Sequence, residues 1–294
     1  MPGLKALLGV SRGPFLLLPP TLIAAGSAAA AHDGFFVWAR ALAALVGLVA
    51  LHAAVNALNE ASDFATGIDL HTTRTPFSGG SGTLPAGLAG RGTAIGVGIA
   101  GSVVGLVVGL GFLRIFGWPF VPFMLLGAFS VLAYTPGLIR LGIGEVFAGL
   151  GLGGLPVLGA AFVQEGRIAP AAVAACIHAY FMTFNLLLLN EFPDEEADRA
   201  GGRRHLVITL GRRGAAWIYA AAALGAPVSI AIAVLLGALP PLCLLAMAPS
   251  ALLVRPLRWA STHPEKPVPI PAMGDNVIWN LATNVVMAAT LALA

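Results

Sequence analysis

Apolar stretches long enough to cross a lipid bilayer recur along this entire chain. A helix needs about 20 apolar residues to span the hydrocarbon core, and it satisfies its own backbone hydrogen bonds there. Clusters of charged and turn-forming residues divide the sequence into nine such segments: 13–31, 36–60, 93–115, 117–136, 144–164, 169–190, 214–237, 239–257 and 273–293. The alternating strands of a membrane β-barrel are not seen. The pattern predicts an all-α polytopic bundle of about nine transmembrane helices.

The composition supports the same fold class. Hydrophobic residues make up 58% of the 294 residues and charged residues only 10%, which is more apolar surface than a soluble core of this size can bury. No second domain is apparent, so we expect a single membrane domain over residues 1–294. Prolines interrupt the first apolar segment and no clear cleavage site follows it, so we expect no cleavable signal peptide.

The distribution of basic residues predicts the orientation of the bundle. With nine segments and the N-terminus inside, 3 of the 16 basic residues, Arg40, Arg114 and Arg167, lie outside, and the other 13 face the cytoplasm. This bias follows the positive-inside rule. We therefore expect an integral protein of the cell (inner) membrane whose active site faces the cytoplasm. Most of the acidic residues lie on the same side, which the rule does not require.

One acidic stretch lies at the end of the second apolar segment. His52, Asn56, Asn59 and Asp63 are spaced to form one polar helix face that ends in a carboxylate. Gly67 then permits a turn that brings Asp69 back toward the same point.

A second acidic stretch follows the sixth apolar segment, where five carboxylates fall within eight residues, Glu191 to Asp198. Asn190 precedes Asp194 at the spacing that separates Asn59 from Asp63. Pro193 lacks a backbone donor and is expected to kink the helix there. The two stretches therefore present matching Asn/Asp faces on one side of the membrane.

Carboxylates gathered in this way repel one another unless cations neutralise them. Hard oxygen ligands suit Mg²⁺, which is typically held by one or two carboxylates together with substrate phosphates. Arginines in the neighbouring Gly-rich loops suit the phosphates themselves. The sequence thus predicts a site that holds a diphosphate through Mg²⁺.

At this point the chain resembles the UbiA superfamily of intramembrane prenyltransferases. Those proteins carry nine helices around a central cavity and two aspartate-rich motifs, after helices two and six. The motifs here are Asn59-Glu60-Ala61-Ser62-Asp63 followed by Asp69, and Asn190, Asp194 and Asp198. The runs TPFSGGSGTLPAGL and YTPGLIRLGIGEVFAGLGLGGLPVLG are similar to the MenA-like branch, which prenylates naphthoquinone precursors. Two departures are Glu60, where Asp is usual, and His205, where Thr or Asn is common.

The resemblance implies a fold, a reaction and residue roles. We expect a cavity open to the cytoplasm, in which a polyprenyl group passes from an allylic diphosphate to an aromatic acceptor, with the isoprenoid tail in an apolar channel between helices. The acceptor implied is 1,4-dihydroxy-2-naphthoate or a related quinone precursor. Asn59, Asp63 and Asp69 would form one Mg²⁺ cluster, and Asn190, Asp194 and Asp198 the other. The expected diphosphate contacts are Arg74, Arg140, Arg204, Arg12 and Arg203.

Two other functions are consistent with parts of this pattern. A terpene cyclase of the same superfamily would ionise the diphosphate and close a ring without an aromatic acceptor, and the motifs alone do not distinguish it. A transporter would place ionisable residues near the midplane on broken helices, whereas the acids here gather at helix ends. The expected partners are the diphosphate, the acceptor and the bilayer, with no nucleic acid.

Overall fold

The computed structural model describes residues 3–294, in which the secondary structure is helical and no β-strand occurs. The helical segments are α1 (Leu4–Val10), η1 (Gly13–Leu17), α2 (Leu18–His32), α3 (Trp38–Thr66), α4 (Ile68–His71), α5 (Arg91–Phe116), η2 (Trp118–Phe120), α6 (Val121–Leu132), η3 (Tyr134–Leu138), α7 (Ile139–Leu141), α8 (Gly144–Gly149), η4 (Leu150–Gly154), α9 (Leu155–Glu165), α10 (Pro170–Glu191), α11 (Glu195–Ala200), α12 (Leu206–Leu235), η5 (Pro241–Leu253), α13 (Val254–Thr262) and α14 (Ile270–Leu293). Of these, η3 and η4 are π-helical turns.

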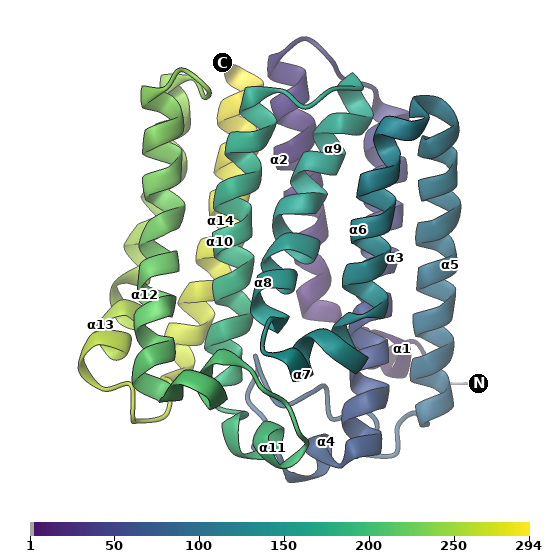
Figure 1. The fold of residues 1–294 in the computed structure, drawn as a ribbon, viewed down its shortest axis with the longest axis vertical. Helices are drawn as coiled ribbons and strands as arrows, with labels where there is room; N and C mark the ends of the chain where they lie inside the picture. The colour runs from purple at the N-terminus through teal and green to yellow at the C-terminus, as the bar shows by residue number, and fades with distance from the viewer. Residues whose placement is uncertain (1–2) are drawn as a thin grey trace.

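Each predicted apolar segment corresponds to a helix of the structure (Figure 1). In the described part of the chain, 8 helices are long and apolar enough to cross a membrane, and the remaining apolar helix, Trp118–Leu132, is shorter. It is shorter than expected because the chain leaves the α-helix at Ala133 and enters the π-helical turn η3. The predicted all-α membrane bundle is confirmed, and the protein is an integral membrane protein.

Two local predictions at helix boundaries need refinement. The kink expected at Pro193 is a complete break, because α10 ends at Glu191 and α11 begins at Glu195 after a short turn. Helix α12 begins before its predicted start, but Gly211 inside it has a non-helical backbone (φ 71°, ψ 164°). The residues before Gly211 therefore form a separate turn, and the long helix, which contains Pro227, starts close to the predicted position.

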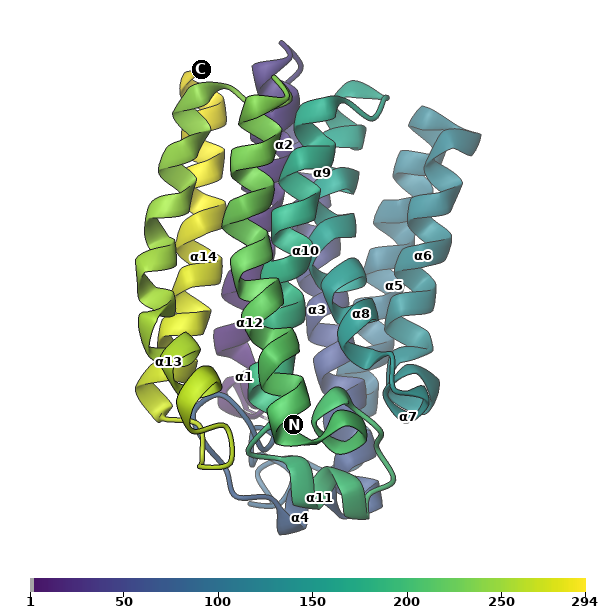
Figure 2. The ribbon, with the colours of Figure 1, turned by 60° about the vertical axis from the view of Figure 1, so that its left-hand side comes forward.

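The two acidic motifs end at the same end of the bundle, although they are far apart in the sequence. Helix α10 contacts α2, α8, α9, α12 and α14, so it runs through the interior. Figures 1 and 2 show α4, which follows the first motif, and α11, which carries part of the second, side by side below the long helices. Because of this arrangement, the acidic groups share one layer at one face of the membrane.

Glycines allow α5 to pack closely on α3. Gly101, Gly105 and Gly109 repeat every four residues, a pattern that suits close helix packing in lipid. A methyl group at Gly101 would overlap the carbonyl oxygen of Ala50 and lie 3.0 Å from the Ala54 Cβ. At Gly111, on the same helix, a methyl group would meet nothing within 4 Å.

We therefore predict opposite outcomes for two alanine substitutions in α5. Gly101→Ala should destabilise the protein by about 1–3 kcal/mol, because backbone atoms cannot move away from the new methyl group. Gly111→Ala should leave stability unchanged or raise it slightly, because alanine is the better helix former. The midpoint of thermal unfolding in detergent measures both. Equal midpoints for the two variants would contradict the close packing of α3 and α5.

Candidate active site

A polar cavity of about 140 Å³ lies where the two acidic motifs meet. Eight residues predicted for the site line it: Arg12, Asn59, Asp63, Asp69, Asn190, Asp194, Asp198 and Arg203. His52 and Asn56 of the polar face of α3 line it as well. The turn at Gly67 has φ 81° and directs the chain into α4, which places Asp69 in the cavity wall as predicted.

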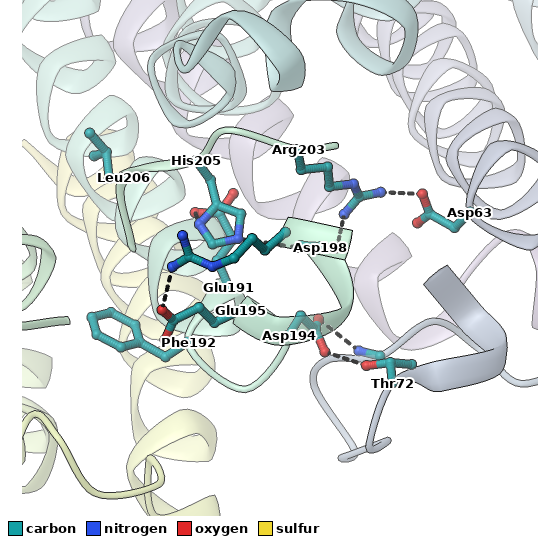
Figure 3. Close-up of polar contacts among 12 residues, drawn as sticks. Asp63, Thr72, Glu191, Phe192, Asp194, Glu195, Asp198, Arg203, His205 and Leu206 are labelled. Carbon is teal, nitrogen blue, oxygen red and sulfur yellow. Dashed lines mark hydrogen bonds and ion pairs between the residues drawn. The ribbon is translucent and has the colours of Figure 1, made fainter. Parts of the chain in front are cut away.

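Arg203 connects the two motifs across the cavity (Figure 3). Its Nη1 lies 3.1 Å from Asp198 Oδ1, and its Nη2 pairs with the Asp63 carboxylate. The same Nη2 donates to Asn59 Oδ1 at 3.2 Å. Burial alone would lower the pKa of Arg203, but the carboxylates of Asp63 and Asp198 raise it above its ordinary value. This guanidinium is therefore a permanent positive charge between the motifs.

The glycine-rich segment 78–83 folds over the first motif and fixes the second. Asp194 accepts hydrogen bonds from Thr72 Oγ1 at 2.8 Å and from the Gly79 N–H at 3.0 Å. Gly80 has φ 72°, and a Cβ there would lie 2.5 Å from Asp69 Oδ1. Only glycine combines that conformation with so close an approach to a carboxylate. The run of glycines in TPFSGGSG is thus explained by the backbone path beside Asp69.

Arg12 reaches the cavity from the N-terminal end of the bundle. It has a left-handed backbone conformation, φ 51°, in the turn between α1 and η1. Its Nε lies 3.4 Å from Glu60 Oε2, and Glu60 also accepts from the Ser81 N–H at 3.1 Å. Burial alone would lower the pKa of Arg12, but Glu60, Asp63 and Asp69 together raise it. Glu60 itself does not line the cavity.

The carboxyl groups outnumber the positive charges in this cavity. Burial, with Glu60 and Asp63 nearby, raises the pKa of Asp69 to about 7, and burial beside Asp198 raises the pKa of Asp194 to about 6. Asp69 Oδ2 and Asn190 Oδ1 are buried without a hydrogen-bond partner. Unpaired carboxylate and amide oxygens of this kind fit a hard divalent cation. Within residues 3–294, however, no three His, Cys, Asp or Glu side chains converge on one point, since Arg203 stands between Asp63 and Asp198.

Three of the predicted arginines lie outside the cavity lining, and all three are exposed. The Nη2 of Arg74 donates to the main-chain oxygen of Asp69 at 3.0 Å, so its side chain braces α4 from behind. The N–H of Arg204 donates to Ile139 O at 3.0 Å, which ties the loop before α12 to α7. Arg140 lies on α7 with its side chain in solvent. The structure therefore brings together Arg12 and Arg203 and leaves these three at the periphery.

Several cavity residues were not assigned to the site from the sequence. Tyr134, Glu191 and His205 line the cavity, and Glu145 lies against Glu191 behind it. Burial raises the pKa of Tyr134, which keeps its phenol protonated. The available signal was an aromatic residue or an acid within glycine-containing segments: YTPG lies in the π-helical turn η3, and GIGEVFAG directly precedes the π-helical turn η4. Such turns are frequent at functional sites.

An apolar groove of about 640 Å³ adjoins the polar cavity. It lies between α3, α5, α6 and α9, and it is lined by Leu51, Ser102, Leu106, Phe123 and Gly159 among others. His52 and Leu152 line both spaces, so the two are neighbours. Exposed residues such as Ile99 and Leu125 border the groove, which therefore opens on the outer surface of the helices.

A bundle of apolar helices with two acidic motifs gathered on a polar cavity at one end defines an integral membrane protein. The chain matches the sequence profile of the UbiA prenyltransferase family over residues 17–280 and belongs to that family.

Two curated relatives share sequence with this chain. A 1,4-dihydroxy-2-naphthoate octaprenyltransferase of Bacillus subtilis (strain 168) is 27% identical over 203 residues, which cover 68% of this chain and 64% of the relative. A protein of the same name from Escherichia coli (strain K12) is 29% identical over 119 residues, 38% of this chain and 39% of the relative. The similarity thus spans less than two thirds of either relative.

Solved structures share the fold over nearly the whole chain. A UbiA homologue from Aeropyrum pernix K1 gives a TM-score of 0.72 at 17% identity, covering 95% of this chain and 98% of its own. A UbiA homologue from Archaeoglobus fulgidus, bound to GPP and Mg²⁺, gives a TM-score of 0.68 at 14% identity, and the match covers 98% of this chain and 100% of the homologue. At this identity the likeness establishes the fold.

We predict that Arg203 is required for stability when no metal is bound. Arg203→Met leaves Asp63 and Asp198 buried without a cation, and breaking a buried ion pair costs about 3–5 kcal/mol. Arg199 provides a matched control, because it is 56% exposed and, within residues 3–294, its one ion-pair partner is Glu195, one turn away. Arg199→Met should cost no more than about 0.5 kcal/mol. Thermal unfolding in detergent with a chelator present tests both, and similar small losses would show that Arg203 does not hold the motifs together.

Proposed function

We propose that this protein transfers a polyprenyl group from an allylic diphosphate to an aromatic acceptor, with Mg²⁺ bound at the two Asn/Asp motifs. The observation that carries the proposal is the meeting of both motifs on one cavity, joined by Arg203 and faced by Arg12. Two fixed guanidinium groups and unpaired carboxylate oxygens suit a diphosphate held with metal ions. The fold shared with a homologue bound to GPP and Mg²⁺ supports the same proposal.

The chain's own residues would divide the work as follows. Asn59, Asp63 and Asp69 would hold one ion, and Asn190, Asp194 and Asp198 the other. Bound Mg²⁺ would neutralise charge on the diphosphate and make it a better leaving group. Arg12 and Arg203 would contact the diphosphate oxygens, with Arg74, Arg140 and Arg204 contributing positive charge from the periphery. Thr72 and the Gly79 N–H would hold Asp194 in position, as they do in the structure.

The reaction would proceed by ionisation of the allylic C–O bond. The bonding electrons leave with the diphosphate, and the guanidinium groups of Arg12 and Arg203, together with bound Mg²⁺, would stabilise that charge, which is usually the largest catalytic term. The electron-rich ring then forms a C–C bond to the allylic cation and afterwards loses a proton or its carboxyl group as CO₂. The acceptor most consistent with the curated relatives is 1,4-dihydroxy-2-naphthoate or a related quinone precursor.

The isoprenoid tail would lie in the apolar groove between α3, α5, α6 and α9. The groove meets the polar cavity at His52 and Leu152, so a diphosphate in the cavity directs its tail into it. Its opening toward lipid suits a substrate that partitions into the bilayer. The positive-inside pattern would place the cavity on the cytoplasmic side of the cell membrane, where the water-soluble acceptor arrives.

Activity should require both motifs and a divalent cation. Purified protein is incubated with Mg²⁺, octaprenyl diphosphate and 1,4-dihydroxy-2-naphthoate, and then with a chelator. We expect prenylated product only with metal, and losses of at least 100-fold for Asp63→Asn and for Asp194→Asn, since each removes a ligand charge from the leaving-group site. Glu196→Gln, an exposed acid of α11, is the control and should keep its rate. Full turnover after chelation would overturn the proposal, and a hydrocarbon product without acceptor would favour the cyclase.

We predict that filling the groove selects against long tails. Gly159 lines the groove opposite Phe123, and a Cβ there would lie 3.4 Å from the Phe123 ring. Gly159→Phe should lower kcat/KM for octaprenyl diphosphate by about tenfold or more, and leave geranyl diphosphate within about threefold. Leu110→Phe, on the exposed side of α5 and outside the groove lining, should change neither. An equal loss with both donors would place the tail elsewhere.

A further inference from the structure

Three buried polar side chains beside the cavity have no role in binding metal or diphosphate. Glu191 is the last residue of α10, His205 precedes α12, and Glu145 lies in the first turn of α8. They are 7%, 2% and 0% exposed, respectively. Glu191 and His205 line the polar cavity, and Glu145 lies directly behind Glu191. Figure 3 shows His205 above Glu191, on the side of Asp198 away from Asp63.

Glu191 and His205 have buried polar atoms without hydrogen-bond partners. Glu191 Oε2 and both ring nitrogens of His205 are buried and make no hydrogen bond in the described part of the chain. His205 Nε2 lies 3.4 Å from Asp198 Oδ2, and Nδ1 lies 4.0 Å from Glu191 Oε2, without hydrogen-bond geometry. Leaving such a buried group unsatisfied is unfavourable, and a ligand with the right donor removes that penalty on binding.

The surrounding structure holds this group in place. The Glu145 Oε1 accepts from the Leu206 N–H at 2.6 Å, which joins α8 to the start of α12 beside His205. The glycine-rich run after Glu145 lets this segment approach α10: a Cβ at Gly153 would lie 2.6 Å from Thr183 Oγ1. Glu191 is therefore brought against Glu145 by close backbone packing and not by the flexibility of a surface side chain.

We propose that Glu191 and His205, with Glu145 behind them, bind a hydroxyl group of the aromatic acceptor. The proposal rests on the prenyl transfer proposed above. A phenolic O–H supplies the donor that Glu191 Oε2 lacks, and its oxygen can accept from the imidazole. Apolar neighbours in the cavity wall, such as Ile139, Leu152 and Leu186, suit an aromatic ring.

The position also suits the chemistry. His205 contacts Asp198, and Asp198 contacts Arg203. The Asp198 carboxylate therefore lies between the hydroxyl subsite and the guanidinium group proposed to hold the diphosphate. A ring held there by its hydroxyl group lies next to the carbon released from the diphosphate. The subsite would thereby select phenolic and quinol acceptors and orient the ring.

The test compares the wild type with two Glu191 variants, and the acceptor with two of its methyl ethers. The dissociation constants of 1,4-dihydroxy-2-naphthoate and of its two monomethyl ethers are measured by calorimetry for the wild type, Glu191→Leu and Glu191→Gln. Loss of a hydrogen bond to a carboxylate corresponds to about 10- to 100-fold. We expect the wild type to bind one of the two methyl ethers about 10- to 100-fold more weakly than 1,4-dihydroxy-2-naphthoate. Glu191→Leu should bind this ether and 1,4-dihydroxy-2-naphthoate with equal affinity. Glu191→Gln, which keeps the side-chain size, should show a preference between those of the wild type and Glu191→Leu.

Kinetic constants separate this role from a structural one. In Glu191→Leu and Glu191→Gln, KM for the acceptor should rise while KM for the prenyl diphosphate stays within about twofold. An unchanged preference for the free hydroxyl in both variants, or equal increases in both KM values, would overturn the subsite. If the wild type binds the acceptor with this preference but transfers no prenyl group to it, the proposed transfer fails while the hydroxyl subsite stands.

Discussion

Two helix ends rich in carboxylates approach each other inside an apolar bundle only when positive charge lies between them. Arg203 supplies that charge, since its guanidinium contacts Asp63 on α3 and Asp198 on α11 at the same time. The remaining features follow from this contact. The segment 78–83 covers the first motif and anchors Asp194 of the second, and Arg12 enters from the N-terminal side. Even so, burial, with Glu60 and Asp63 nearby, raises the pKa of Asp69 to about 7, so the two arginines do not restore that pKa to its ordinary value.

Glycine spacing determines where the bundle is tight and where it is open. Close contact at Gly101 and Gly105 joins α5 to α3, and close contact at Gly153 joins η4 to α10. The first contact holds one wall of the apolar groove, and the second brings Glu145 to Glu191. In lipid there is no hydrophobic force between helices, so such backbone approaches contribute much of the packing energy. The groove and the acid pair are both consequences of residues without side chains.

The sequence predicted the bundle well because each helix is encoded locally. Hydropathy, with the clusters of charged and turn-forming residues, located every long helix. The two motifs, and the family resemblance that added Arg12 and Arg203, grouped eight residues that line one cavity. The sequence did not show which arginines line the cavity, because a loop arginine near a membrane face has the same sequence pattern whether its side chain points inward or outward. Arg203 and Arg204 are neighbours, yet the first lines the cavity and the second is exposed. Likewise, the meeting of Glu145 with Glu191 depends on helix packing, which no spacing along the chain reveals.

Glu60, where Asp is usual in the family, has a different role in this structure from the other polar residues of its motif. Asn59 and Asp63 are one helical turn apart, are hydrogen-bonded at 2.8 Å, and both face the cavity. Glu60 projects from another side of α3, where it accepts hydrogen bonds from Ser81 and pairs with Arg12. A non-glycine residue in the left-handed conformation costs about 1–2 kcal/mol, so Arg12 needs such an anchor to keep its position. The carboxylate at position 60 therefore holds the arginine and the glycine-rich segment, while its neighbours Asn59 and Asp63 on α3 face the cavity.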